Sequence, residues 1–466
     1  MSILNTIKGW FSVLLKKRAK EEFNIEPIGS EQMEVWIREC IEIYKGNPSW
    51  LDAEDNIDTI NAAKAVCSEV ARLAMLGVGI NIDGSARAEW LQEQVDHIYN
   101  QLRQWVEYGC AYGTIILKPN GDGIDMYAPG EYEVTEAKDG KITGIVFHNW
   151  KQVGDKWFTR LEWHRFENGV YAITNKCYVG DSPDDTRKAV SIDITPWAGM
   201  LEAAHIANVT KPLYGAFKTP AANNIELNSP YGMPIISDAV QELRDLYIAY
   251  SRNAEEIFDS SRTVLLDSDT LIPTGGKVKN TPNAWEYQRK EMKLPRSVKN
   301  VRGDGKEMFY QEINPQLNTA VRLEGINALL GQIGYKCGFS NGHFVFNKSG
   351  GIQTATQVEA DQQRTIQLIK DVRDQLEGCI TDLIYAINIF ADLFGLAPRG
   401  SYELAVSFGD ITYNFEEDRS RWWGYVISGK VPAWRFFVKF EGMTEKEAKE
   451  MIAEAAPAGI GLFSEE

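Results

Sequence analysis

Histidine and cysteine supply much of the metal-binding and catalytic chemistry of proteins, and both are sparse in this chain of 466 residues. The five histidines share no spacing typical of metal ligands; they are His97, His148, His164, His205 and His343. The six cysteines form no Cys-x-x-Cys pair; they are Cys40, Cys67, Cys110, Cys177, Cys337 and Cys379. This scatter argues against a zinc ribbon and a dense disulfide framework, and it favours reduced, buried thiols in a cytosolic setting.

One segment approaches the pattern of a phosphate-binding loop without completing it. GYVISGKV, residues 424–431, fits the pattern up to its last position, which must be Ser or Thr to hold magnesium and is Val431 here. The preceding EEDRSRWW has a helical pattern, whereas such a loop follows a buried strand. We interpret the match as chance.

Two groups of acidic residues could support acid–base chemistry, but both lie where turns and helix starts are expected. They are Asp267 with Asp269, and Glu416 with Glu417 and Asp418. The chain has no Gly-x-Ser-x-Gly nucleophile motif. A pair of glycosidase carboxylates stays open, although nothing singles out two of them. The sequence therefore predicts no catalytic residue, no metal site and no cofactor.

The composition indicates a folded protein with an acidic surface. Hydrophobic residues make up 44% and charged residues 24%, and 49 Lys and Arg against 65 Asp and Glu leave a net charge of −16. The length suits several compact domains or one elongated subunit with several lobes. Because the charge repels nucleic acid, tight sequence-independent DNA binding is not expected, and a role with DNA would be one in which the protein does not bind the DNA tightly.

Hydrophobic periodicity separates a mixed N-terminal half from a helical C-terminal half. The first hundred residues follow the helical period, and from Gly109 to about Ile206 the period changes to two, which predicts strands. Asn168-Gly169 is the strongest hairpin signal. We expect residues 1–228 to form an α+β lobe. The elements expected after it are a helix at 229–261 with Pro234 in its first turn, a strand-like segment at 262–311, a helix at 312–337, a long helix at 354–391, a strand within 392–415 and helices in 416–466.

A long loop separates two of these helices. It begins with GFSNGHFVFNKSGG and spans residues 338–353, about 16 residues where compact connections between helices run about 2–8. Gly, Ser and Asn leave its backbone mobile, and Lys348 is its only formal charge.

The N-terminal residues predict a short amphipathic helix. Their apolar part is short, basic residues follow it and no small-residue cleavage site appears, so a signal peptide is not expected. We expect residues 1–18 to be a packing or subunit-contact element, with a membrane-surface helix as the alternative. No run of 18 apolar residues occurs, so no membrane-spanning helix is expected.

The order of these segments resembles the portal proteins of tailed bacteriophages, in the subgroup of long-tailed phages of Gram-positive hosts. The resemblance runs nearly end to end and rests on WIRECIEIYKGNPSW, VEYGCAYGTIILKP, NSPYGMP, TATQV and VSFGDITYNFEEDRSRWWGYVISGKV. None of these is a catalytic signature, so the specificity comes from their order and spacing. One departure is Ala433, where the family pattern has Ser at a helix start.

This resemblance implies an α+β, mostly helical portal fold with a wing, a two-helix stem, a clip and a crown. The implied parts are the wing at 1–228, stem helices at 229–261 and 312–337, the clip at 262–311, a tunnel loop at 338–353, a long wing helix at 354–391, a returning wing strand at 392–415 and the crown at 416–466. The tunnel loop would face DNA with Asn341, His343, Phe344, Phe346, Asn347, Lys348 and Ser349.

The resemblance also implies a homo-oligomeric ring, a dodecamer, at one vertex of a phage head. Double-stranded DNA would pass through it during packaging and ejection without sequence recognition. The partners would be the terminase packaging motor, the major capsid and scaffolding proteins and the head–tail adaptor, with no membrane. The protein would be no enzyme, and it would reside in the virion and, during assembly, in the host cytoplasm.

Two other functions stay open from the residues alone. An enzyme of unknown reaction, with the α+β lobe as its catalytic domain, predicts a deep pocket whose titratable groups have shifted pKa values in the monomer. A membrane-surface scaffold anchored by residues 1–18 predicts lipid binding that is lost when those residues are removed. A ring predicts instead helix surfaces that are apolar or charge-complementary only in the assembly.

Overall fold

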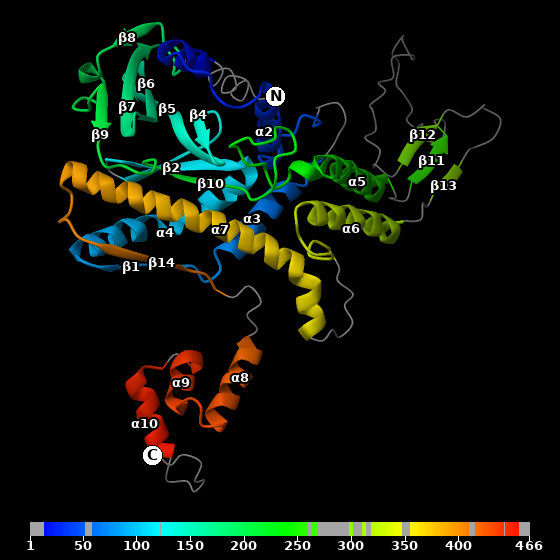
Figure 1. The fold of residues 1–466 in the computed structure, drawn as a ribbon. Coiled ribbons are helices and arrows are strands. Elements are labelled where there is room, and N and C mark those ends of the chain that lie inside the picture. Colours follow the sequence, from blue (N-terminus) through cyan, green and yellow to red (C-terminus); the bar gives the residue numbers. More distant parts are fainter. Residues whose placement is uncertain are drawn as a thin grey trace, which may run out of the picture.

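The alternating segments between residues 109 and 206 form antiparallel strands, and the segments with helical periodicity on either side form helices (Figure 1). The computed structural model describes residues 14–51, 58–121, 123–259, 263–267, 298–301, 310–313, 318–346, 355–409, 415–441 and 443–455. Helices and mainly antiparallel sheets occur together, so the expected α+β class is confirmed.

The bounds of the elements follow the chain from the N-terminus. The helices are residues 14–23, α2 (Glu31–Tyr44), α3 (Ala62–Ala74), α4 (Ala86–Tyr112), α5 (Val240–Asp259), α6 (Thr319–Lys336), α7 (Ala355–Phe394), α8 (Phe415–Ile427), α9 (Ala433–Glu441) and α10 (Glu445–Ala455), with 3-10 turns η1 (Ile192–Ile194) and η2 (Ser237–Ala239). The strands are β1 (Gly79–Gly84), β2 (Thr114–Asn120), β3 (Gly123–Tyr127), β4 (Tyr132–Lys138), β5 (Lys141–Val153), β6 (Lys156–Glu167), β7 (Val170–Gly180), β8 (Lys188–Val190), β9 (Ala203–Ile206), β10 (Gly215–Lys218), β11 (Thr263–Asp267), β12 (Val298–Val301), β13 (Tyr310–Ile313) and β14 (Tyr402–Ser407).

The largest sheet has the strand order β4-β5-β6-β7-β8, and β9 pairs with β7 beside β8. Its β6–β7 hairpin turns at Asn168 and Gly169, whose φ angles are 51° and 81°. Two successive positive φ angles are typical of the two-residue turn that matches the twist of a hairpin. The hairpin expected at this dipeptide is therefore confirmed.

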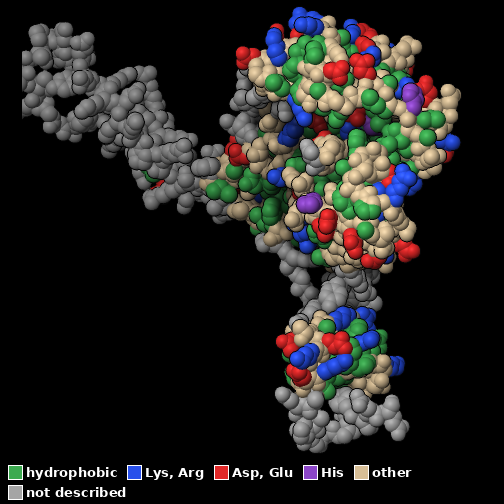
Figure 2. Space-filling model, turned by 90° about the vertical axis from the view of Figure 1, so that its left-hand side faces the viewer, with side chains coloured by type: hydrophobic (Ala, Val, Ile, Leu, Met, Phe, Trp, Pro, Cys, Tyr) green, Lys and Arg blue, Asp and Glu red, His purple; other side chains and the backbone are tan. Residues whose placement is uncertain are grey.

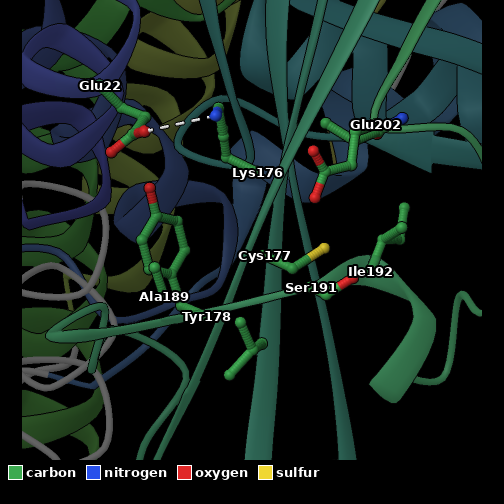
Figure 3. A pocket seen from close by; sticks show the side chains of 10 residues that line it. Glu22, Lys176, Cys177, Tyr178, Ala189, Ser191, Ile192 and Glu202 are labelled. Atoms are coloured by element: carbon green, nitrogen blue, oxygen red, sulfur yellow. Dashed lines mark ion pairs between the residues drawn. The ribbon is translucent and has the colours of Figure 1, made fainter.

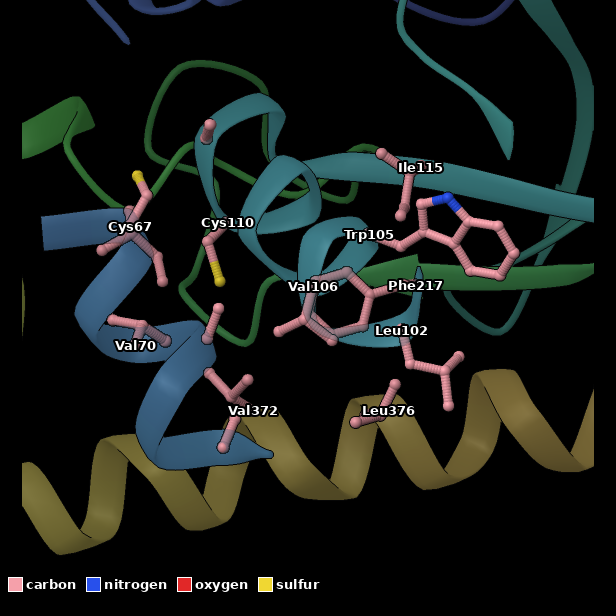
Figure 4. Packing of buried hydrophobic residues seen from close by; sticks show 14 of the residues in the cluster. Cys67, Val70, Leu102, Trp105, Val106, Cys110, Ile115, Phe217, Val372 and Leu376 are labelled. Atoms are coloured by element: carbon pink, nitrogen blue, oxygen red, sulfur yellow. The ribbon is translucent and has the colours of Figure 1, made fainter. Parts of the chain in front are cut away.

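A helical layer packs against the smaller sheet β10-β2-β3, with α7 lying across α3 and α4 (Figure 1). Figure 4 shows Val372 and Leu376 of α7 facing Val70 of α3 and Leu102 of α4. These side chains belong to the main hydrophobic core, which continues into α5 and α6. Burial of such aliphatic side chains contributes about 1.5–3 kcal/mol each.

Arg87 closes the C-terminal end of α7. Its guanidinium, which is 1% exposed, donates to the carbonyls of Pro398 at 2.7 Å, Asn388 at 3.0 Å and Ala397 at 2.9 Å, and it forms a 2.7 Å ion pair with Asp392. The Asn388 carbonyl and the Asp392 carboxylate belong to α7 and the other two carbonyls to the segment after it, so this buried cation of α4 holds the end of α7 and the following segment together.

Arg373 of α7 does the same for the C-terminal end of α3. It donates to the carbonyls of Ala74 at 3.0 Å, Leu73 at 3.1 Å and Leu76 at 3.0 Å, and to that of Gly409 at 2.7 Å. The long helix is thus fixed at two points along its length.

Two helices start later than the sequence pattern predicts. In the first, Pro234 precedes the turn η2, and α5 begins only at Val240. The reason is that Gly232 N–H donates to Thr114 Oγ1 at 2.8 Å and Ile235 N–H to the carbonyl of Cys110 at 2.9 Å, which holds this stretch against α4 and β2.

The second late start is that of α6, which the sequence pattern placed at 312–337. It begins at Thr319 because the residues before it, Tyr310–Ile313, pair with β11 as a strand. The long helix α7 continues to Phe394, three residues beyond its expected end.

Residues 14–23 form a helix that packs on the large sheet. Leu15 and Ala19 are buried against Val146, Leu161 and Tyr178. Among the described residues, no helix is both long and apolar enough to cross a membrane. Part of the proposed N-terminal anchor, residues 1–13, lies outside the described residues.

The helices α8, α9 and α10 pack on one another below the main body (Figure 1). Their small core contains Val426, Phe436 and Phe440. Thr444 caps α10 by accepting a hydrogen bond from Glu447 N–H at 3.3 Å, while the Glu447 carboxylate accepts from Thr444 N–H at 2.9 Å. This reciprocal pair is a capping box.

Candidate functional site

The loop after α6 begins with a glycine in the left-handed conformation. Gly338 has a φ of 91°, which side chains other than glycine rarely allow. Its N–H donates to the carbonyl of Tyr335 at 3.2 Å, and Phe339 N–H donates to the carbonyl of Gly334 at 2.8 Å. These two bonds make a Schellman motif, which ends the helix and turns the following residue back against it.

Phe339 anchors this loop in the hydrophobic core. Its side chain is fully buried, and its ring centre lies 4.7 Å from that of His343 and 4.8 Å from that of Phe344. His343 and Phe344 are 5.0 Å apart, so the three rings form one cluster. Gly334 leaves room for it, because a Cβ there would lie 3.1 Å from the ring of Phe344.

Hydrogen bonds tie the same stretch to two other helices. Ser340 N–H donates to Thr365 Oγ1 of α7 at 2.9 Å, and Thr365 N–H donates to Ser340 Oγ at 3.2 Å. Both residues are buried. His343 Nε2 lies 3.2 Å from Glu69 Oε1 of α3, and Arg72 is the main cause that lowers the pKa of Glu69. The first half of the loop is therefore fastened to its own subunit.

The residues assigned to a DNA-facing loop have different surroundings in the structure. Asn341 and Phe346 are exposed, and the N–H of Phe346 donates to Asn327 Oδ1 at 3.0 Å. His343 and Phe344 contact their own subunit through the ring cluster. The remaining three, which lie outside the described residues, are Asn347, Lys348 and Ser349. The DNA-facing role of this loop stays a prediction.

Sequence reasoning did not single out Phe339 and Ser340, which hold the loop in place. A signal for Phe339 is present in the sequence, because Gly338 followed by an apolar residue after a helical pattern is typical of a Schellman motif. No comparable signal exists for Ser340, whose partner Thr365 is 25 residues away.

Helix α6 has a buried apolar line and an exposed line of mostly small and apolar residues, of which Tyr335 stacks against the Arg364 guanidinium of α7 at 3.8 Å. The inner line of residues is buried and consists of Ile326, Leu330, Ile333 and Cys337. The outer line, which we call the α6 outer stripe, is exposed and consists of Val321, Gly325, Ala328, Gln332 and Tyr335. Its members recur at alternating steps of four and three, which is the spacing of a helix–helix contact seam.

Two glycines of α6 have no packing role within the described part of the subunit. Around Gly325 and Gly331, a Cβ would meet nothing within 4 Å. Glycine in a helix costs about 0.5–1 kcal/mol relative to alanine, and no described contact offsets that cost. Val321 and Tyr335 of the stripe are 70% and 53% exposed. A second helix approaching closely would give these residues a function, because the distance between packed helices depends on side-chain size.

A second candidate lies inside the large sheet, around Glu162. Its Oε2 accepts from Lys118 Nζ at 2.5 Å, Arg160 Nη2 at 2.9 Å and Asn149 Nδ2 at 3.3 Å. Its Oε1 lies 2.9 Å from His164 Nε2. Both carboxylate oxygens are therefore occupied by partners from β2, β5 and β6.

The electrostatics of this buried cluster follow from burial and from the adjacent cations. Burial alone would raise the pKa of Glu162, but Lys118 and Arg160 lower it well below its usual range. Burial lowers the pKa of Lys118 and that of His164, and Glu162 partly opposes both effects. Glu162 is therefore an ionised carboxylate held between the cations of Lys118 and Arg160.

The tautomer of His164 follows from its neighbours. The ionised Glu162 carboxylate can only accept, so the proton of neutral His164 resides on Nε2, which lies 2.9 Å from Glu162 Oε1. Nδ1 then accepts from Tyr171 OH at 2.9 Å, and this hydroxyl in turn accepts from Leu213 N–H at 3.0 Å. Sequence reasoning assigned His164 to a sheet face, which is confirmed. Glu162 is only 7% exposed, so the cluster stabilises the sheet interior and offers a substrate little access.

The described surface is mixed in charge, and the cysteines lie beneath it. On the face seen in Figure 2, acidic and basic side chains are interspersed over the described residues. Within the described ranges, no group of three or more His, Cys, Asp or Glu side chains could hold a metal ion. All six cysteines are buried and free, and His148 is buried with its pKa lowered to about 4 by that burial.

Comparisons with known proteins give structural likenesses but no match of sequence. No protein-family model matches the sequence, and no curated protein matches it. The fold is similar to a chain of the "Virion of native gene transfer agent (GTA) particle", with a TM-score of 0.38 and 9% identity, covering 89% of this chain and 95% of that chain.

Proposed function

We propose that the chain is the subunit of a homo-oligomeric ring, the portal at one vertex of a phage head, through which double-stranded DNA passes. The observation that carries the proposal is the α6 outer stripe, an exposed line with the spacing of a helix–helix seam. In a ring with head-to-tail contacts, each subunit offers one face to the neighbour on one side and a different face to the other. The stripe suits one of these faces.

The arrangement around α6 supports the same proposal. Helices α5 and α6 lie side by side and lead to the small sheet β12-β11-β13 (Figure 1). Their sequence order agrees with the stem and clip that the resemblance implies. The loop after α6 is fastened at Phe339 and Ser340, and residues 338–353 would be the tunnel loop of the proposed ring. The net charge of −16 suits a channel wall from which DNA is repelled.

The remaining roles in this proposal rest on the resemblance. The ring would be a dodecamer, would perform no catalysis, and would dock the terminase packaging motor and later the head–tail adaptor. Its outer lobe would contact the major capsid and scaffolding proteins. The buried cluster at Glu162 would then be a stabilising element of that lobe.

The test is the molar mass of the purified full-length protein by light scattering, with negative-stain images of the same fraction. The proposal predicts a single large species near the mass of a dodecamer, with rings that have a central hole. A stable monomer at all protein concentrations, or a twofold dimer without a hole, would contradict it.

A further inference from the structure

Strand β1 has a capped outer edge. It forms an antiparallel ribbon with β14 at the lower margin of the main body in Figure 1. Beyond β1, Gln92 of α4 accepts with Oε1 from Ile82 N–H at 2.9 Å and donates with Nε2 to the carbonyl of Ile80 at 3.1 Å. Since these peptide groups of Ile80 and Ile82 point to α4, they do not bond to β14.

Strand β14, in contrast, has an open outer edge. Val406 lies opposite Ile80, and Leu404 lies opposite Ile82. In such non-hydrogen-bonded pairs, the N–H and C=O groups of both residues point away from the partner strand. Within the described residues, the N–H groups of Leu404 and Val406 have no hydrogen-bond acceptor. The strand, YELAVS, also lacks the lysine, proline or bulge that commonly protects an edge.

The large sheet shows how a protected edge differs. The short strands β9 and β8 pair with β7 at residues 171–174 and 177–179. Between these pairings, the N–H of Asn175 donates to the carbonyl of Glu202 at 2.7 Å. Figure 3 shows Glu202 and Ile192 of the covering segments beside Cys177 of β7. The outer edge of β7 is therefore covered over these residues by the same chain.

The apolar side chains of the β1–β14 ribbon are covered unequally. Ile80 and Ile82 of β1 are each 5% exposed. Leu404 and Val406 pack against the same main core, yet they are only half-buried. Another strand beside β14 would cover them further, and it would extend a two-stranded ribbon, which is marginally stable alone.

The outward face of the ribbon carries two carboxylates. Asp83 and Glu403 are exposed and lie directly opposite each other, a position in which like charges are destabilising. Neither forms an ion pair with another residue that the structure describes. A lysine or arginine on a strand added beside Glu403 would offset this repulsion. The edge thus combines unpaired peptide groups with an apolar inner face and an acidic outer face.

We propose that β14 binds an extended segment of a partner protein as a third strand of this ribbon, with apolar residues toward the core and a basic residue beside Glu403. Main-chain hydrogen bonds to Leu404 and Val406 would provide affinity, and the alternating side chains would provide specificity. The proposal does not depend on ring formation.

The test is a calorimetric titration of the full-length protein with the hexapeptide TVKVTV, acetylated and amidated at its ends. Its valines alternate with threonine and lysine, as the two faces of the ribbon require. We expect a Kd of about 0.5 mM or below. Val406→Pro removes an outward N–H but no bond to β1, a change that an edge strand tolerates, and it should weaken binding about tenfold or more. Circular dichroism checks that this variant folds.

The matched control is Val406→Ala, which also shortens the side chain but keeps the N–H, so it should bind within about threefold of the wild type. Glu403→Lys, at an exposed position, should weaken binding of TVKVTV and strengthen that of TVEVTV. Absence of binding up to about 5 mM, or equal binding by Val406→Pro and Val406→Ala, would overturn the proposal. A lower oligomeric mass of Val406→Pro than of Val406→Ala, measured without peptide, would assign the edge to a second copy of this chain and would also overturn it.

Discussion

The large sheet buries charged side chains, whereas helix α6 exposes apolar ones. On one face of the large sheet, the charged side chains of Glu162 and Arg160 are buried together with that of Lys118 of β2, and each finds its partner within the subunit. On α6, the apolar side chains of Val321 and Tyr335 are mostly exposed. The charged groups of the sheet are therefore paired within one subunit, whereas the α6 outer stripe would be covered only by the second chain that we propose. Mutations among the buried charges should therefore change the free energy of unfolding of the subunit, whereas mutations in the α6 outer stripe should change its assembly.

The largest expected effect comes from breaking the sheet's buried cluster. Glu162→Ala leaves Lys118 and Arg160 buried without their carboxylate, and we expect it to lower the free energy of unfolding by about 3–5 kcal/mol. Urea denaturation followed by circular dichroism measures this change. Glu167→Ala is the control, because this exposed carboxylate at the end of the same strand makes only surface contacts, with Arg165 at 3.0 Å and His205 at 3.8 Å among them, and its loss should cost at most about 1 kcal/mol. Equal effects of the two changes would contradict the account.

Glu133 should make the stability of the sheet lobe fall as the pH rises from about 4.5 to about 7. Burial raises the pKa of this β4 carboxyl from 4.5 to about 7, although Lys16 lies 4.0 Å away. A carboxyl whose pKa is raised by folding stabilises the fold fully below pH 4.5, and this stability is lost as the pH rises through 7. Glu133→Gln should therefore match the wild type near pH 4.5 and be more stable by about 2–3 kcal/mol near pH 8. A constant difference across this window would refute the shifted pKa.

The smallest expected effect lies on the α6 outer stripe. Gly325→Ala should stabilise the dissociated subunit by about 0.5–1 kcal/mol, because alanine favours the helix, yet it should weaken assembly by adding a methyl group at the seam. Denaturant unfolding and mass photometry measure the two effects. Gly378→Ala is the matched control, since Gly378 of α7 also has open space around it but lies beside Asp374 and Asp382. Opposite signs are expected only for Gly325→Ala.

Much of the fold could be predicted from the sequence, because the relevant signals are local. The period of two gave the strands, the period of 3.6 gave the helices, and Asn168-Gly169 gave the hairpin. Helix starts were less predictable. Gly232 and Ile235 use their N–H groups in contacts with distant segments, and these contacts delay α5.

The buried cluster could not be predicted, because its sequence pattern indicates the opposite. Arg160, Glu162 and His164 alternate with apolar residues, which is typical of a strand with one solvent-facing side. The loop containing Trp197 covers that side, since its ring packs under the Arg160 guanidinium at 5.1 Å. The α6 outer stripe was not singled out from the sequence, because only the structure distinguishes the exposed line of this helix from its buried one.

Protection of the α6 outer stripe in the assembled protein tests the central claim most directly. Ala328→Cys places a thiol on the stripe, and Ala405→Cys places one on the exposed face of β14 as the control. The six native cysteines are buried, so a maleimide should label the introduced thiols selectively. The account predicts that the thiol at position 328 is protected in the oligomer and labelled after dissociation, while that at 405 is labelled in both states. Equal labelling of both positions in the oligomer would contradict it.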